Sequence, residues 1–164
     1  MLESVKNSFD TISRKEGELS SFLVYPLLII VLYEVLMRYM FNAPTTGGFE
    51  ATAFLYGLHY MFGLAYTDVY DGHVKVDIFT ARLSEKKQAV IGIITNLLFF
   101  MPVMICMTIG AFNFAYSSTL GFEVNSTSWA PPIWPLKILM AVCFLFLLGQ
   151  GIANLIGHIN CLKQ

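Results

Sequence analysis

Charged side chains are scarce in this sequence. Of its 164 residues, 13% are Asp, Glu, Lys or Arg, whereas 56% are hydrophobic and the mean hydropathy is +0.64. Soluble globular domains carry about twice that share of charge. The formal net charge is −1, and Lys and Arg do not gather on one helical stripe, which argues against a nucleic-acid surface. The composition therefore indicates an integral membrane protein.

Paired cysteines and catalytic sequence motifs are also lacking. Cys106, Cys143 and Cys161 form no C-x-x-C pair, and their odd number and wide spacing argue against a disulfide framework or a zinc knuckle. There is no G-x-S-x-G, no H-E-x-x-H and no phosphate-binding Gly-rich loop. We therefore expect no enzymatic activity, no metal and no other cofactor.

Long apolar stretches are the main feature that is present. They predict an all-α integral membrane protein, a single membrane domain over residues 1–164 with four transmembrane helices. The spans are predicted at residues 19–41, 49–69, 90–116 and 135–157. The first is about 34 Å long at helical rise, enough for a hydrocarbon core of roughly 30 Å. The second is shorter and rich in aromatic residues, and Pro102 predicts a kink in the third.

The distribution of basic residues predicts the orientation. Lys and Arg avoid the loops at 42–49 and 117–134 and occur before the first span, between the second and third, and after the fourth: Lys6, Arg14, Lys15, Lys75, Arg82, Lys86, Lys87 and Lys163. The positive-inside rule then places both chain ends in the cytoplasm, N-in and C-in, and the two loops without Lys or Arg outside. Trp129 and Trp134 would form an aromatic belt at the outer interface.

Two segments outside the spans are amphipathic. Residues 2–16 place Leu2, Val5, Phe9 and Ile12 on one helical stripe, which predicts an interfacial helix on the membrane surface. A frayed tail with a chance pattern is the alternative. In the cytoplasmic loop between spans two and three, Asp71 and Gly72 predict a turn. A second amphipathic, interfacial segment follows it, with the apolar residues Val74, Val76, Ile78 and Phe79. Its carboxylates and His73 could suggest a metal site, but their spacing matches no metal loop.

Charged residues inside a span require an explanation, because each costs about 2.5 to 3.5 kcal/mol at the bilayer centre. Glu34 and Arg38 lie four residues apart in span one, where they can form an ion pair within the helix. Glu34 is either a structural partner of Arg38 or a proton or cation relay. Glu50 lies at the positive end of span two and is interpreted as a helix cap or as a partner of Arg38. His59 is interpreted as a hydrogen-bonded packing residue.

Small residues recur every fourth position in two spans. Gly149, Ala153 and Gly157 do so in span four, and Ala53 and Gly57 in span two. This spacing lets membrane helices pack closely, so these faces are expected to meet other helices. Gln150 and Asn154, also four residues apart, are expected to donate hydrogen bonds to a partner helix. No repeated halves or paired broken helices mark a substrate site.

Taken together, the order of the motifs resembles the small membrane subunit of tripartite ATP-independent periplasmic (TRAP) transporters. The resemblance runs along nearly the whole chain and rests on these residues: Arg38, Tyr39, Phe41, Asn42, Glu50, Gly72, His73, Val74, Val76, Asp77, Leu83, Ser84, Ser126, Ser128, Trp129, Pro131, Pro132, Pro135, Lys137 and Gln150. Many members carry a Trp shortly before the acidic residue, where this chain has Gly47, Gly48 and Phe49.

The resemblance implies a multi-pass protein of the bacterial inner membrane. Such a subunit forms a stable complex with a large membrane subunit in a sodium-coupled importer of organic acids, to which a periplasmic binding protein delivers the substrate. It would brace the large subunit, which moves the substrate by an elevator motion, and would hold neither substrate nor sodium. Its outer residues Trp129, Pro131, Pro132, Trp134 and Lys137 would contact the binding protein. The alternative is a self-sufficient proton-coupled carrier, a homodimer that uses Glu34.

Overall fold

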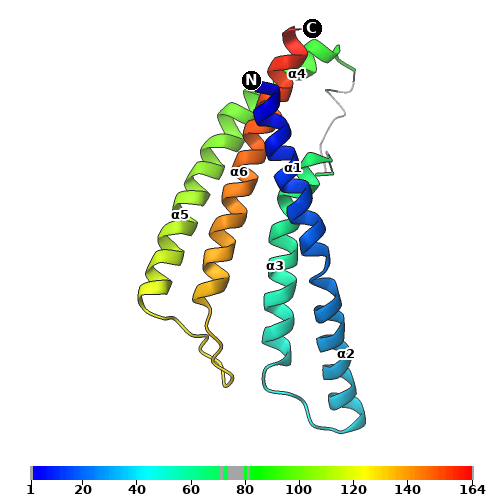
Figure 1. Cartoon of the computed structure of the whole chain (residues 1–164), viewed down its shortest axis with the longest axis vertical. Helices are drawn as coiled ribbons and strands as arrows, with labels where there is room; N and C mark the ends of the chain where they lie inside the picture. The colour runs from blue at the N-terminus through cyan, green and yellow to red at the C-terminus, as the bar shows by residue number, and fades with distance from the viewer. Residues whose placement is uncertain (1, 71, 74–79, 81, 164) are drawn as a thin grey trace.

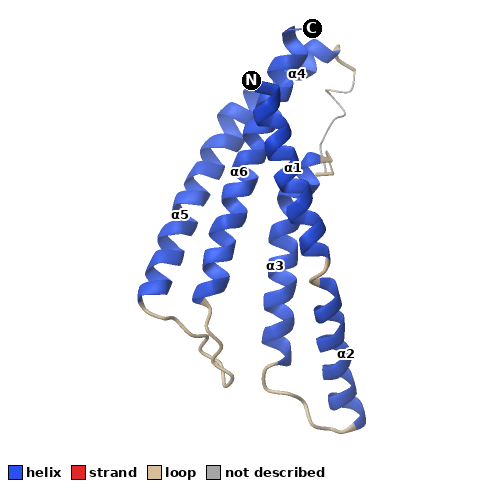
Figure 2. Cartoon of the chain, viewed as in Figure 1, coloured by secondary structure: helices blue, strands red, loops and turns tan. Residues whose placement is uncertain are grey.

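In the computed structural model the chain is a set of long helices (Figures 1 and 2). Residues 2–70, 72–73, 80 and 82–163 are described. The elements are α1 (Leu2–Ser21), α2 (Val24–Met40), α3 (Gly48–Val69), α4 (Glu85–Thr95), the π-helical turn η1 (Asn96–Phe100), α5 (Met101–Leu120) and α6 (Trp134–Lys163). Both termini lie at one end of the molecule, the terminal end, and the loops 41–47 and 121–133 lie at the other, the loop end (Figure 1).

Helix α6 is the centre of the packing. It contacts α1, α3, α4 and α5, whereas α2 pairs with α3. Ala65 of α3, Met104 of α5 and Leu147 of α6 form one buried cluster. A second cluster joins alanines of α5 and α6, whose small side chains permit close approach. The α2–α3 pair and the α5–α6 pair diverge toward the loop end (Figure 1).

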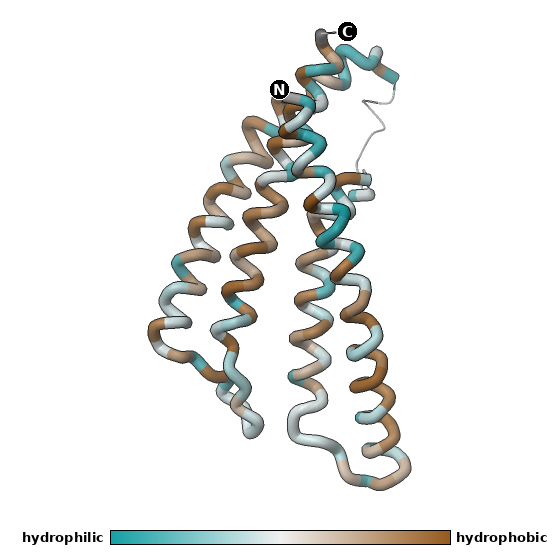
Figure 3. Tube along the Cα trace, viewed as in Figure 1, coloured by the Kyte–Doolittle hydropathy of each residue, from teal (hydrophilic) through white to brown (hydrophobic). Residues whose placement is uncertain are grey.

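Within the part of the chain that the structure describes, three helical segments are long and apolar enough to cross a membrane. They are Glu3–Met40, Glu85–Leu120 and Trp134–Leu162, and α3 is not among them. Figure 3 shows strong hydrophobic colour along α2 and α6, with paler colour on α3. The all-helical architecture is thus as predicted, and the fourth crossing and the N-in, C-in orientation stay predictions.

The first predicted span is interrupted rather than continuous. Helix α1 ends at Ser21 and α2 begins at Val24, because Pro26 has no N–H to donate to the carbonyl of Phe22 and its ring crowds the preceding turn. The imidazole Nδ1 of His59 lies 3.0 Å from the carbonyl oxygen of Ser20, next to this break. His59 is therefore the hydrogen-bonded packing residue that the sequence predicts.

The amino-terminal helix is longer and more buried than predicted. It runs to Ser21 rather than to residue 16, and packs along α3 and α6. Its contact edge is small and polar, with Ser13, Gly17 and Ser20 buried. Val5 and Ile12 remain exposed beside this edge, as a membrane-facing stripe would require. Its location at the membrane surface stays a prediction.

The irregularity at Pro102 is a π turn. Pro102 cannot donate a hydrogen bond to the carbonyl of Leu98, and the N–H of Met101 reaches five residues back to the carbonyl of Asn96. The widened turn η1 accommodates the proline while α4, η1 and α5 continue as one segment.

Candidate functional site

The two loops at the loop end are in contact through Trp129. A Cβ atom added to Gly47 would lie 2.8 Å from Cδ2 of the Trp129 indole, so only glycine permits this approach. The indole from the α5–α6 loop thus covers the start of α3.

The α5–α6 loop is a short hairpin. The N–H of Asn125 donates to the carbonyl of Pro131 at 2.9 Å, and the N–H of Ile133 donates to the carbonyl of Glu123 at 3.0 Å. Pro131 is buried, whereas Pro132 is exposed. Trp134 begins α6 and meets the ring of Phe122 edge-on. The hairpin therefore presents Trp129 and Pro132 as part of a defined surface.

Lys137 fixes the base of this hairpin. Its ammonium donates to Oε2 of Glu123 at 2.5 Å and lies 3.7 Å from the centroid of the Phe114 ring. The hydrogen bond from Lys137 lowers the pKa of the Glu123 carboxyl. Because the folded pKa lies below the unfolded one, this contact stabilises the hairpin above the usual carboxyl pKa and is lost as the pH falls through the lowered value.

Glu34 contacts the α2–α3 loop. Its carboxylate accepts a hydrogen bond from the hydroxyl of Thr45, and it lies against Gly48 at the start of α3. Arg38 is exposed, and among the described residues no ion pair joins it to Glu34 or Glu50. The predicted pairing within the helix is therefore replaced by a contact between helix and loop. Oε2 of Glu50 is buried without a hydrogen-bond partner in the described structure.

Asn42 explains why α2 ends where it does. It has a left-handed backbone with φ of 50°, which Asn tolerates better than most residues, and the next N–H, of Ala43, bonds to the carbonyl of Met37 at 3.0 Å. The turn directs the chain toward Gly47 and Glu34, so this motif residue shapes the loop end.

At the terminal end, the predicted cytoplasmic motif closes α3. The N–H of Gly72 donates to the carbonyl of Thr67 at 2.9 Å, and a Cβ at Gly72 would lie 2.9 Å from the Thr67 methyl. Nε2 of His73 lies 3.2 Å from the carbonyl oxygen of Leu64. Asp77 and the predicted amphipathic segment at 74–79 lie outside the described residues.

The small-residue face of α6 is filled by α1. Ala153 is fully buried, and a Cβ at Gly149 would lie 2.7 Å from the Phe9 ring. A Cβ at Gly157 would lie 3.4 Å from Cε of Lys6. On the corresponding face of α3, no packed neighbour among the described residues lies within 4 Å of a Cβ at Gly57, and Ala53 is exposed.

A buried polar network joins α1 to α6. The hydroxyl of Ser13 donates to Oε1 of Gln150 at 2.9 Å, and Nε2 of Gln150 donates to Oδ1 of Asp10 at 2.8 Å. Lys6 pairs with the second oxygen of Asp10 at 3.1 Å. Gln150 thus finds its predicted partner helix within the chain.

The α1 members of this network were not identified from the sequence. The small residues Ser13, Gly17 and Ser20 repeat at four and three residues, which places them on one face of the helix as in α6, and could have revealed the contact. Glu16 was also missed. Both of its carboxylate oxygens are buried without a hydrogen-bond partner among the described residues.

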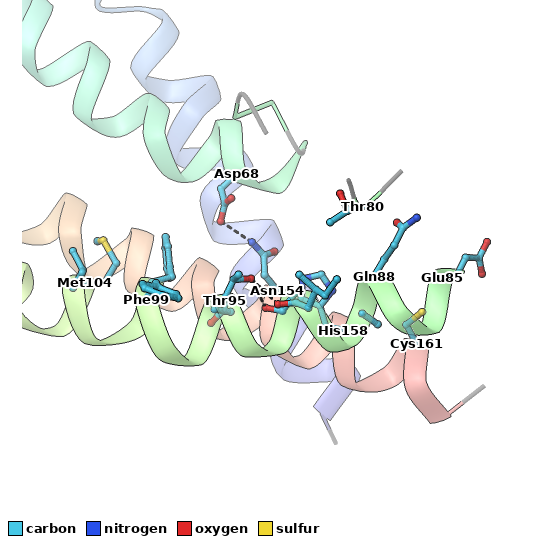
Figure 4. Close-up of a pocket in the computed structure, with 16 residues that line it drawn as sticks. Asp68, Thr80, Glu85, Gln88, Thr95, Phe99, Met104, Asn154, His158 and Cys161 are labelled. Carbon is cyan, nitrogen blue, oxygen red and sulfur yellow. Dashed lines mark hydrogen bonds between the residues drawn. The ribbon is translucent and has the colours of Figure 1, made fainter. Parts of the chain in front are cut away.

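A cavity of about 920 Å³ lies between α3, α4 and α6 at the terminal end (Figure 4). Nδ2 of Asn154 donates to Oδ2 of Asp68 across it at 2.7 Å. Phe99 and Met104 line its apolar end, and His158 and Gln88 its polar end (Figure 4). Among the described residues, no three His, Cys, Asp or Glu side chains lie together as they would to hold a metal ion.

The contact between the two loops yields a first prediction. Gly47→Ser keeps a side chain suited to the position before a helix but adds a Cβ under Trp129. We expect a loss of about 1 kcal/mol in the free energy of unfolding, because the half-exposed indole can move aside in part. In a Trp129→Ala background the same change should be neutral. An equal loss in both backgrounds would show that Trp129 is not the cause.

The comparison with known families agrees with this architecture. The model of the tripartite ATP-independent periplasmic transporters, DctQ component, matches residues 27–161, most of the chain. No curated protein matches the chain significantly. The matched family is a transporter component rather than an enzyme, and its members are membrane proteins of TRAP transporters. The chain, with its apolar helices, belongs to this DctQ family of small TRAP transporter components.

Proposed function

We propose that this chain is the scaffold of a sodium-coupled importer of organic acids in the bacterial inner membrane. It braces a large elevator-type membrane subunit in a stable complex, and its loop end faces the periplasm. The terminal end, with both chain termini, then faces the cytoplasm. The DctQ match carries the transporter assignment. The exposed apolar faces of α2 and α5 support a role within the bilayer.

The loop end also supports transient docking of the periplasmic binding protein. The hairpin is braced by Lys137 and Glu123, and it is joined to the α2–α3 loop through Trp129. Two loops held in one arrangement can present a preorganised surface, which lowers the ordering cost of association.

Reconstitution tests the scaffold role. Vesicles that contain the large subunit, with the binding protein outside and a sodium gradient, should take up substrate only when this chain is present. The chain should copurify with the large subunit in a one-to-one complex. Uptake by this chain alone, isolated as a homodimer, would support the carrier alternative instead.

Replacing Glu34 by glutamine distinguishes the scaffold role from that of a proton-coupled carrier. The amide can still accept the hydrogen bond from Thr45 but cannot release a proton at neutral pH. We expect uptake within about twofold of the unmodified complex, a difference of about 0.4 kcal/mol. Thr45→Val serves as a structural control, since it removes the hydrogen bond and leaves the carboxylate. Loss of uptake in Glu34→Gln alone, with normal assembly, would contradict the scaffold interpretation.

A further inference from the structure

One side of α3 is left open by the rest of the chain. Phe49, Ala53, Tyr56, Gly57 and Tyr60 follow one another at steps of four, three, one and three residues, which places them on one helical face. Tyr56 is 55% exposed and Tyr60 is 62% exposed. We call these five residues the open face of α3.

The open face carries a packing pattern that this chain does not use. In α6 the same small-residue spacing is covered by α1, with Phe9 over Gly149. In α3 none of the described side chains or neighbouring helices lies within 4 Å of a Cβ at Gly57, and Ala53 is exposed. Small residues in a membrane helix permit close approach of a second helix. The surface at Ala53 and Gly57 would therefore permit the close approach of a second helix.

The polarity of α3 indicates what covers this face. Helix α3 packs beside α2 and α6, which belong to segments apolar enough to cross a membrane. Helix α3 itself is not among those segments. The backbones of Tyr56 and Tyr60 lie about 12 and 18 Å along the helix from its start. Neither makes a hydrogen bond with a described residue. Hydrocarbon offers such hydroxyls no partner, whereas a protein helix does.

The exposed face of α2 provides the contrast. Tyr33 has the same exposed fraction as Tyr56, 55%, and lies about 11 Å from the loop end of its helix. Its exposed neighbours are long aliphatic side chains, Ile29, Leu32 and Leu36, which suit contact with lipid tails. Tyr33 likewise makes no hydrogen bond with a described residue, so an exposed tyrosine does not by itself distinguish the two helices. The small residues Ala53 and Gly57 set α3 apart from the aliphatic surface of α2.

We propose that the open face of α3 is the surface on which a transmembrane helix of the large TRAP membrane subunit packs. The partner helix lies close to Ala53 and Gly57 and offers polar groups to the hydroxyls of Tyr56 and Tyr60. The inference rests on the proposed function, because it takes the large subunit as the partner and adds where it binds.

Two glycines allow a matched test in the full complex. Gly57 in α3 and Gly110 in α5 both lie inside helices, and at neither does a packed neighbour from the described part of the chain lie within 4 Å of an added Cβ. Leucine at either position should therefore leave the fold of this chain intact. We expect Gly57→Leu to reduce the large subunit recovered by affinity purification at least tenfold, and Gly110→Leu to leave recovery unchanged.

Crosslinking gives a second readout that does not depend on a disruptive variant. A photoreactive p-benzoyl-phenylalanine replaces Tyr56, Tyr60 or, as control, Tyr33, and the complex is irradiated in native membranes. Crosslinks to the large subunit from positions 56 and 60, with none from 33, are expected. Crosslinks from 33 alone, from 56 or 60 to a second copy of this chain, or from 56 and 60 to lipid only would overturn the inference.

The two proposals fail differently. If the unmodified chain copurifies with the large subunit and the Gly57→Leu variant copurifies with it equally well, only the docking face is contradicted. If Gly110→Leu alone releases the large subunit, α5 is the contact. If the unmodified chain does not copurify with the large subunit at all, the proposed function is contradicted and the docking face with it.

Discussion

Replacing Gly17 by alanine is expected to loosen α1 from α3, although a single methyl group is added. The new Cβ would lie 2.2 Å from Cδ2 and 2.5 Å from Cβ of Tyr66. Because Cβ is attached to the backbone of α3, rotation of the ring cannot relieve the clash, and the helices must separate. Alanine favours helix by about 1 kcal/mol over glycine, so the net loss should be about 2 kcal/mol in the free energy of unfolding.

The native thiol of Cys143 reports this change directly. Cys143 of α6 is 4% exposed, and α6 packs against α1. In a Cys106→Ser, Cys161→Ser background, a loss of 2 kcal/mol should raise the rate of Cys143 labelling by maleimide roughly thirtyfold.

Gly63→Ala is the matched control for Gly17→Ala. Gly63 has nothing within 4 Å of an added Cβ, so alanine there should stabilise α3 or leave it unchanged. If Gly17→Ala stabilises the chain as Gly63→Ala does, α1 does not pack on α3 as the structure has it.

The long helices were predictable because hydropathy reports them directly. Residues 90–116 and 135–157 fall within α4–η1–α5 and α6. The break before Val24 was missed although Pro26 is visible in the sequence, because an apolar run gives no sign of where a backbone bend is tolerated. The π turn was expected only as a kink, since one proline is compatible with several local geometries.

Side-chain partners were harder to predict than helices. Spacing places Glu34 and Arg38 on one face, but it does not reveal that a loop eleven residues away offers Thr45 to Glu34. The small-residue pattern likewise predicts a contact without naming the partner. For Gly149 the partner is α1, which the sequence favoured as a separate surface helix. Contacts between distant segments depend on the tertiary arrangement, which local periodicity does not contain.

Gln150→Leu is expected to have an effect at least as large as that of Gly17→Ala. Gln150 is 1% exposed and is bonded to both Ser13 and Asp10, so an isosteric apolar side chain leaves the hydroxyl and one carboxylate oxygen without partners. Each buried polar group left unsatisfied costs about 1 to 3 kcal/mol. Because Asp10 keeps its bond to Lys6, we expect a total loss of about 3 kcal/mol in the free energy of unfolding.

A double-mutant cycle with Ser13→Ala isolates the contribution of the hydrogen bond. Ser13→Ala should cost about 1 kcal/mol when Gln150 is present and should restore stability when position 150 is leucine, because it then removes a buried hydroxyl that has no partner. Asn113→Leu on α5 is the matched amide control. Its side chain is exposed and makes no hydrogen bond with a described residue, so the change should alter stability by less than about 0.5 kcal/mol. Additive losses for Ser13→Ala and Gln150→Leu would mean that α1 and α6 are not joined through this network.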